Sequence, residues 1–423
     1  FSYFWKDKKY FRKNNDFNQS YVAFRNVNTD LFLGKLDVIF MAIDTERGVP
    51  GLKWNFADTL GRRHDQLILT NATYSNKAKH GVIFSYVLNN QAFYNPMIFI
   101  DSEHLNVGTA LKGWRKDKIN GNISLDNNFI FNNEKLNSNV NGDHNRKTIL
   151  WNSAMNILWD NIEIRPLLTM VYSPEFYEEI LPSVSVKVEP VCINSSHIIF
   201  SYSNHFRAPG FNDLYWEPGG NPELKSEKTQ SAFIRFSKKY DSDYQIQAEV
   251  FYKLSDNLIQ WLPQQQYWRP VNITSAERYG LKMNFTGKIY NHTATQLNVS
   301  RFFSNNLSPG FYNGLDLRFI PNWLANMNVH SKIKQWSFLA TMAYTSSFIS
   351  MYSYPEDLRI NSNLICNGSV GKQFSGKFWQ SNINIHINNI FNVYHESISA
   401  YPEPGRNIQI SLLIQSKSME KKK

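Results

Sequence analysis

Short segments in which apolar and polar side chains alternate recur along the whole chain, and they limit its fold more than any other feature. The segments 245–253, 281–289, 382–388 and 407–415 place aliphatic or aromatic residues at most alternate positions. Asn, Gln, Lys, Thr and Glu fill most positions between them. Because side chains alternate across a strand, each segment has one apolar and one polar face. The sequence therefore predicts a protein built from two-faced β-strands.

The length and number of these segments favour strands that cross a membrane. We count roughly eighteen, many of them about ten residues long, which is the length of a tilted membrane-crossing strand, whereas soluble strands usually have about five or six residues. Aromatic residues recur near the segment ends and would form girdles at the two membrane interfaces. They are Tyr202, Trp261, Tyr267, Trp268, Tyr290, Trp323 and Trp336. We therefore predict an all-β fold, a transmembrane antiparallel β-barrel with a polar lumen; a soluble β-protein with these aromatics in its core is the alternative.

Composition agrees with a barrel and argues against other membrane proteins. The 423 residues include 15% aromatics, yet the mean hydropathy is −0.43. The longest apolar stretch, Leu36 to Ile43, contains Asp37 and is far shorter than the roughly 18 residues of a membrane-spanning helix. No linker divides the chain, which indicates one large unit. The opening residues contain no apolar leader segment, so for an exported protein we expect the leader to lie upstream of Phe1.

Nothing in the chain predicts catalysis, a metal or a cofactor. The ten histidines lack the spacing of a metal site. Cys192 and Cys366 are far apart, and both are interpreted as plain strand residues. The net charge of +10 comes from scattered Lys and Arg, apart from a basic C-terminal tail over 416–423. A basic lumen, or contact with anionic lipopolysaccharide, fits this charge. We therefore expect neither an enzyme nor a nucleic-acid-binding protein.

One connection between strands stands out from the rest. The run from Phe206 to Glu227 reads FRAPGFNDLYWEPGGNPELKSE, and strand-like segments precede and follow it. Its three prolines and three glycines break both helix and strand. A connection of this length within a compact domain is usually functional or disordered.

The order of residues in this run resembles the signature loop of TonB-dependent outer-membrane receptors, especially those for cobalamin and siderophores. The matching residues are Arg207, Pro209, Asn212, Asp213, Gly220, Pro222 and Glu227. Ser226 stands where family members commonly have Pro.

Three further motifs agree with this resemblance and occur in the family's order. RGVPG at 47–51 is similar to a short loop of receptors from Bacteroidota, and 272–282 is similar to a family strand, with Lys282 in place of the usual acid. The C-terminal motif comprises Asn389, Phe391, Asn392, Pro404, Gly405 and Arg406. Together the motifs cover about residues 12–415.

The resemblance implies a barrel of 22 strands that follows an N-terminal plug domain. We interpret residues 1–423 as the barrel portion, beginning after the plug and the first strands. A barrel that lacks strands has open edges, which lipid does not tolerate. The chain is then part of a longer protein, as we expect, or another chain supplies the strands, or it closes as a smaller barrel.

Aromatic and polar residues in two connections are the candidate ligand site, because capture sites combine aromatic walls with a few polar groups. The candidates are Tyr215, Trp216, Glu217, Asn221, Gln265, Tyr267 and Trp268. The charges of Arg207, Asp213 and Glu227 are expected either to join this site or only to brace the loop.

The resemblance implies an outer-membrane receptor for the uptake of a scarce nutrient, cobalamin or a ferric siderophore. Its partners would be outer-membrane lipid and lipopolysaccharide, the small-molecule ligand, and a TonB complex that acts through a plug absent from this chain. The alternative is a plugless passive channel or structural barrel.

Overall fold

The computed structural model describes residues 14–51, 60–76, 79–174, 176–241, 243–263, 267–310, 313–353 and 355–416. Gln264, Gln265, Gln266 and all of the basic tail except Ser416 lie outside these residues. No helix within the described ranges is both long enough and apolar enough to span a membrane.

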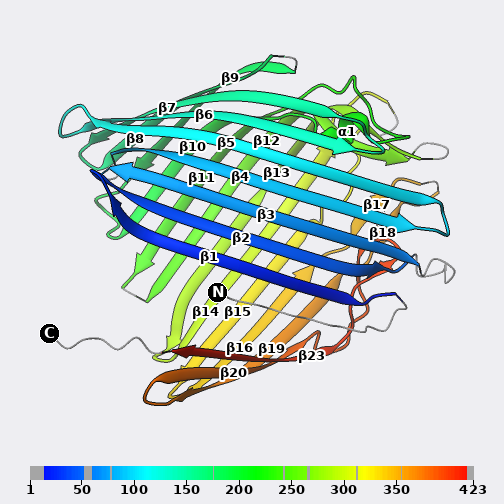
Figure 1. Ribbon diagram of the computed structural model, residues 1–423. Coiled ribbons are helices and arrows are strands. Elements are labelled where there is room, and N and C mark those ends of the chain that lie inside the picture. Colours follow the sequence, from blue (N-terminus) through cyan, green and yellow to red (C-terminus); the bar gives the residue numbers. More distant parts are fainter. Residues whose placement is uncertain are drawn as a thin grey trace.

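Nineteen strands form one antiparallel sheet, and each strand pairs with the next along the chain (Figure 1). They are β1 (Phe17–Leu31), β2 (Gly34–Val49), β3 (Gly61–Asn76), β4 (His80–Asn95), β5 (Ile100–Lys118), β6 (Ile123–Ser138), β7 (His144–Trp159), β8 (Ile162–Ser173), β9 (Tyr177–Val188), β10 (Ser196–Arg207), β11 (Glu227–Tyr240), β12 (Tyr244–Pro263), β13 (Trp268–Tyr290), β14 (Thr293–Asn306), β15 (Trp323–Ile333), β16 (Trp336–Thr345), β19 (Asn363–Ser375), β20 (Trp379–Asn388) and β23 (Asn407–Ser416). The prediction of an all-β antiparallel fold is confirmed.

The two outermost strands of this curved sheet do not pair with each other within the described residues. There β1 pairs only with β2, and β23 pairs only with β20. The ladder that would close the sheet into a smaller, 19-stranded barrel is therefore not found in this part of the chain.

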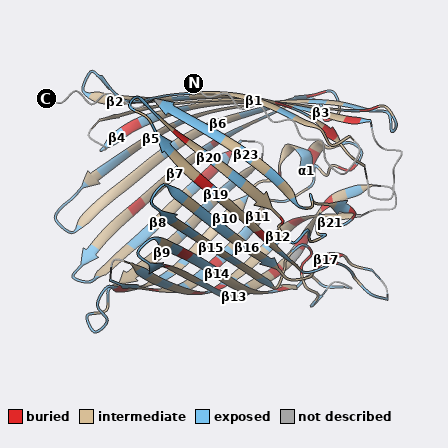
Figure 2. Ribbon diagram, turned by 90° about the horizontal axis from the view of Figure 1, so that it is seen from below, coloured by how far each residue is buried: buried red, intermediate tan, exposed pale blue. Residues whose placement is uncertain are grey.

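The two ends of the sheet differ in their connections. At one end short turns join the strands, as at 32–33, 160–161, 291–292 and 334–335. At the other end lie the helix α1 (Phe211–Tyr215), the hairpin β17 (Phe348–Met351) and β18 (Leu358–Ile360), and the pair β21 (Glu396–Ile398) and β22 (Tyr401–Pro402), which Figure 2 shows gathered together. We call these the turn end and the mouth end.

The strand register places the predicted apolar and polar faces on opposite sides of the sheet. Ile234, Val250 and Leu281 lie side by side on β11, β12 and β13 and are exposed on the outer face, with Val250 60% exposed. The alternate positions on these strands point to the lumen face, where Gln247 and Glu249 of β12 lie beside Arg235 of β11 and Lys282 of β13. A continuous apolar outer face is what lipid requires.

Two sequence interpretations need correction. Cys192 lies in the turn between β9 and β10 and not in a strand, because Pro190 prevents β9 from continuing; Cys366 does lie in β19, and both thiols are free. Trp261 lies near the end of β12 but donates a hydrogen bond to Asp213 of α1, and the guanidinium of Arg318 lies over Trp268, so both tryptophans belong to the mouth and not to an interface girdle. Tyr290 and Trp336 lie at the turn end and are exposed, as a girdle requires.

A buried carboxylate neutralises two cations on the lumen face. Glu249, 8% exposed, accepts hydrogen bonds from the Arg235 guanidinium (Nε at 2.8 Å) and from Lys282 Nζ at 2.7 Å. These three residues are cross-strand neighbours on β11, β12 and β13. Lys282, which departs from the family motif, therefore has a partner in this barrel.

Replacing Glu249 with Gln is expected to lower the free energy of unfolding by about 2 kcal/mol, since two cations would remain adjacent without their counter-ion. Partial exposure of both cations keeps the effect below that of a fully buried pair. Chaotrope unfolding in detergent measures the change. The control is Gln247→Ala on the same face of β12, expected to change stability by less than about 0.5 kcal/mol. If the two substitutions changed stability equally, Glu249 would not be the counter-ion that holds Arg235 and Lys282 together.

Candidate functional site

The connection 208–226 folds over the mouth end around α1. Gly210 begins the helix, and its backbone N–H donates to Asp213 Oδ2 at 2.9 Å. The helix has only five residues, and Leu214, 4% exposed, anchors it. A helix this short is marginal on its own, so its position depends on contacts with the barrel.

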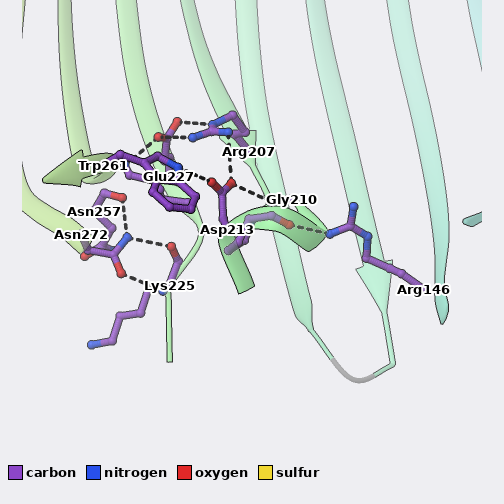
Figure 3. A network of polar contacts seen from close by, with 11 residues as sticks. Arg146, Arg207, Gly210, Asp213, Lys225, Glu227, Asn257, Trp261 and Asn272 are labelled. Carbon is purple, nitrogen blue, oxygen red and sulfur yellow. Dashed lines mark hydrogen bonds and ion pairs between the residues drawn. The ribbon is translucent and has the colours of Figure 1, made fainter. Parts of the chain in front are cut away.

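A paired arginine and glutamate hold the base of this connection (Figure 3). Arg207 and Glu227 face each other across β10 and β11, and Arg207 donates from Nε and Nη2 to the two Glu227 oxygens at 2.8 and 2.9 Å. Glu227 also accepts from the backbone N–H of Ile259 at 2.7 Å. Arg207 Nη1 lies 3.8 Å from Asp213 Oδ2. These contacts show the bracing geometry that was one of the two expected roles for the three charges.

The connection is fastened on one side to β7 and the loop that precedes it. Arg146 Nη1 donates to the carbonyl of Pro209 at 2.7 Å. His144 stacks on Tyr215, with their ring planes 4° apart and the centroids separated by 3.4 Å. Asn141 donates to the Asn212 side chain at 3.1 Å. Pro209, Asn212 and Tyr215 therefore serve as attachment points to this side of the mouth.

On the other side the connection is fastened to β12 and β13. Trp261 Nε1 donates to Asp213 Oδ1 at 2.9 Å, and Asn221 Nδ2 donates to the carbonyl of Pro270 at 3.1 Å. Asn272 accepts from the Lys225 N–H at 2.8 Å and donates to its carbonyl at 2.9 Å, as Figure 3 shows. The connection therefore spans the inner side of the wall from β7 to β13.

Two adjacent glycines allow this close approach. A Cβ on Gly219 would lie 2.1 Å from the carbonyl oxygen of Trp268, and one on Gly220 would lie 2.6 Å from the backbone nitrogen of Trp216. Both clashes involve backbone atoms, so a larger residue at position 219 would push the connection off β13, and one at position 220 would disturb the turn that follows α1. Pro222, the next motif residue after Asn221, is exposed.

Tryptophans and a buried arginine form a cluster beside this connection, which we call the mouth cluster: Trp216, Trp261, Trp268 and Arg318. Trp216 packs edge-on against Trp261, with ring centroids 5.6 Å apart. The Arg318 guanidinium lies 5.2 Å from the Trp268 ring centroid and donates to the Trp261 carbonyl at 3.1 Å and to the Ser350 carbonyl at 2.8 Å. Arg318 is 4% exposed.

The structure brings some predicted ligand residues together and separates others. Trp216 and Trp268 both belong to the mouth cluster, through Trp261 and Arg318 respectively, and Trp268 remains 40% exposed. Glu217 is exposed beside them, and Tyr267 is half-buried next to Trp268. Tyr215 and Asn221 are engaged by His144 and Pro270, so their polar and aromatic surfaces already have partners. Sequence reasoning missed Arg146 and Arg318, which no local pattern distinguishes from other arginines.

The C-terminal motif braces a second mouth connection, between β20 and β23. Asn389 is 3% exposed; its side chain donates to the Val393 carbonyl and accepts from the Val393 N–H, both at 2.8 Å. Asn392 accepts from the Arg406 N–H at 2.8 Å, and a Cβ on Gly405 would lie 2.7 Å from the Asn392 side-chain oxygen. Phe391 is 69% exposed, and Pro404 is exposed. Within the described residues, no group of three or more His, Cys, Asp or Glu could hold a metal ion.

Comparison with known proteins agrees with this architecture. The profile of the family described as "TonB dependent receptor-like, beta-barrel" matches residues 3–390. The chain belongs to this family. Receptors of this kind lie in the outer membrane and are not enzymes, so this TonB-dependent receptor barrel is an outer-membrane protein.

Two curated relatives are vitamin B12 transporters named BtuB. The one from Photobacterium profundum is 36% identical over 97 residues, which is 20% of this chain and 15% of that protein. The one from Vibrio vulnificus is 34% identical over 87 residues, which is 20% of this chain and 14% of that protein.

Solved receptor structures share the fold over most of the chain. The ferric citrate transporter FecA in its unliganded form has a TM-score of 0.75 at 12% identity, covering 98% of this chain and 72% of that one. The siderophore receptor PirA from Acinetobacter baumannii has a TM-score of 0.76 at 10% identity, covering 96% and 72%. At these identities the similarity concerns the fold alone.

Proposed function

We propose that this TonB-dependent receptor barrel takes up a scarce nutrient, such as cobalamin or a ferric siderophore, and that the mouth end faces the cell exterior. The observation that carries this proposal is the mouth cluster, an aromatic surface with a fixed cation beneath a connection held from β7 to β13. Short periplasmic turns and longer extracellular loops are usual for outer-membrane barrels, which supports the orientation. The curated relatives named as vitamin B12 transporters support cobalamin, and the resemblance of the 206–227 run to the signature loop of cobalamin and siderophore receptors supports either ligand.

We further propose that uptake is driven by a TonB complex acting through a plug outside residues 1–423, with outer-membrane lipid and lipopolysaccharide surrounding the barrel. Cells that depend on this protein are expected to accumulate one of the two labelled nutrients, and a protonophore is expected to abolish that accumulation. Accumulation that persists without a proton gradient would instead support the passive channel. Failure to accumulate either nutrient would contradict the substrate class.

Trp216 and Trp268 are the aromatic residues that we propose contact the ligand. Replacing Trp268 with Ala is expected to weaken binding about tenfold or more, because tryptophans that a ligand buries are enriched among residues whose truncation costs about 2 kcal/mol or more. Equilibrium binding of the accumulated nutrient to purified protein measures this. The matched control is Tyr290→Ala, which removes an exposed aromatic residue at the turn end. Unchanged binding after Trp268→Ala would place the ligand elsewhere.

A further inference from the structure

Arg301 is a cation on the lipid-facing side of β14. It is paired in register with Leu281 of β13 and with Trp323 of β15. Cross-strand neighbours share a face of the sheet, and Leu281 belongs to the apolar outer face. The neighbouring residues Ser300 and Phe302 therefore point into the lumen, and Arg301 points toward lipid.

Aromatic rings surround the Arg301 guanidinium, and no carboxylate among the described residues pairs with it. Its central carbon lies 4.5 Å from the Phe303 ring centroid and 5.1 Å from that of Trp323. Glu277 of β13 is the nearest acid on this face of the sheet. Its carboxylate instead accepts hydrogen bonds from Tyr252 and Asn305, at 2.9 and 2.8 Å. A cation without a counter-ion is costly at a lipid-facing position.

An apolar groove of about 950 Å³ lies beside Arg301 on the same face. Its lining includes Phe200, Tyr202, Val250, Tyr252, Leu281 and Phe303. Leu281 and Phe303 connect the groove to Arg301, since one is its cross-strand partner and the other lies under its guanidinium. Groove and cation therefore form one surface that is apolar along its length and positive at its β14 edge.

The height of this surface in the membrane indicates what the cation meets. Tyr252, Tyr279 and Phe303 stack across β12, β13 and β14, with successive ring centroids 6.5 and 5.2 Å apart. With Trp323, at the first position of β15, they form an aromatic band toward the mouth end. Such bands lie at the level of lipid headgroups. A guanidinium at this level meets headgroup phosphates, whose oxygens its planar fork of N–H donors matches.

We propose that Arg301 and the groove bind one phosphate-bearing lipid of the leaflet at the mouth end, with the phosphate on Arg301 and an acyl chain in the groove. Charge complementarity selects this occupant: a second protein chain with an apolar face would fill the groove but leave Arg301 without a counter-ion. The site is separate from the mouth cluster and does not depend on which nutrient is taken up.

Native mass spectrometry of the protein extracted from outer membranes in a maltoside detergent tests this proposal. The probes are dioleoyl phosphatidylglycerol and dioleoylglycerol, which share acyl chains and differ in the phosphate-bearing headgroup. The wild-type protein is expected to retain one phosphatidylglycerol at least about tenfold more strongly than dioleoylglycerol. Equal retention of the two lipids would overturn the phosphate assignment without any variant.

Three substitutions locate the site. Arg301→Gln is expected to weaken phosphatidylglycerol retention about tenfold, whereas Arg301→Lys keeps the charge and part of the binding. Ala232→Phe, which fills the groove from β11, is expected to weaken retention with Arg301 intact. The control is Lys135→Gln, which removes an exposed cation of β6 and is expected to change nothing. Wild-type retention by Arg301→Gln would overturn the proposal, and wild-type retention by Ala232→Phe would overturn its acyl-chain part.

Discussion

Replacing Val250 with Arg is expected to lower the free energy of unfolding by about 1–3 kcal/mol, because Val250 faces lipid between the bilayer midplane, where a cation costs about 2–4 kcal/mol, and the interface, where it costs about 0–1 kcal/mol. Val250 lies near the middle of β12 and is 60% exposed on the outer face, between Ile234 and Leu281. Reversible unfolding from lipid vesicles at several concentrations of chaotrope measures the loss.

Gln247→Arg is the matched control, since it places the same side chain on the same strand but in the lumen. Its cost is expected to be near zero, because water reaches the lumen face and Arg is solvated there. If both substitutions cost the same, or if the lumen variant costs more, the assignment of the two faces is wrong.

Replacing Glu227 with Ala is expected to release the connection 208–226 from the mouth, at a cost of about 2 kcal/mol in docking free energy. The substitution removes both acceptors of Arg207 and the acceptor of the Ile259 N–H. Arg207 is 53% exposed, so water replaces part of the lost interaction and limits the effect. Hydrogen exchange and protease sensitivity of this connection report the release.

Glu223→Ala serves as the control for Glu227→Ala, because Glu223 is an exposed acid in the same connection. It is expected to leave exchange and protease sensitivity unchanged. Nutrient binding should fall for Glu227→Ala alone, since Trp216 is positioned by the same connection. If the connection 208–226 of the Glu227→Ala protein stayed protected from exchange and protease, other contacts would be holding it on the mouth end.

Local periodicity explains why the strands could be predicted from the sequence. The apolar and polar faces of β12, β13, β20 and β23 follow from a pattern of period two, which is independent of distant parts of the chain. Cys192 shows the limit of this reasoning, because a single proline ended a segment that otherwise reads as a strand. The pairing of Arg207 with Glu227 could also be predicted, because the two residues lie at the two ends of one connection and face each other in register.

The contacts at the mouth end were only partly predictable, because they join distant segments of the chain. Arg146 reaches a carbonyl 63 positions away, and Arg318 reaches one 57 positions away. Neither contact leaves a local signal in the sequence. Tyr215 and Asn221 carry suitable chemistry for a ligand, but packing against β7 and β13 decides which of their surfaces stay available, and packing cannot be deduced from residue type.

Thiol labelling in intact cells tests most directly that the mouth end is the outward-facing, ligand-binding end. Glu217→Cys places a thiol on an exposed mouth residue, and the native Cys192 is an exposed thiol in a turn-end connection. A membrane-impermeant maleimide is expected to label the Glu217→Cys thiol in intact cells, more slowly when the accumulated nutrient is present. Cys192 is expected to react only after the outer membrane is permeabilised. Labelling of Cys192 in intact cells, with no labelling at position 217, would contradict the account.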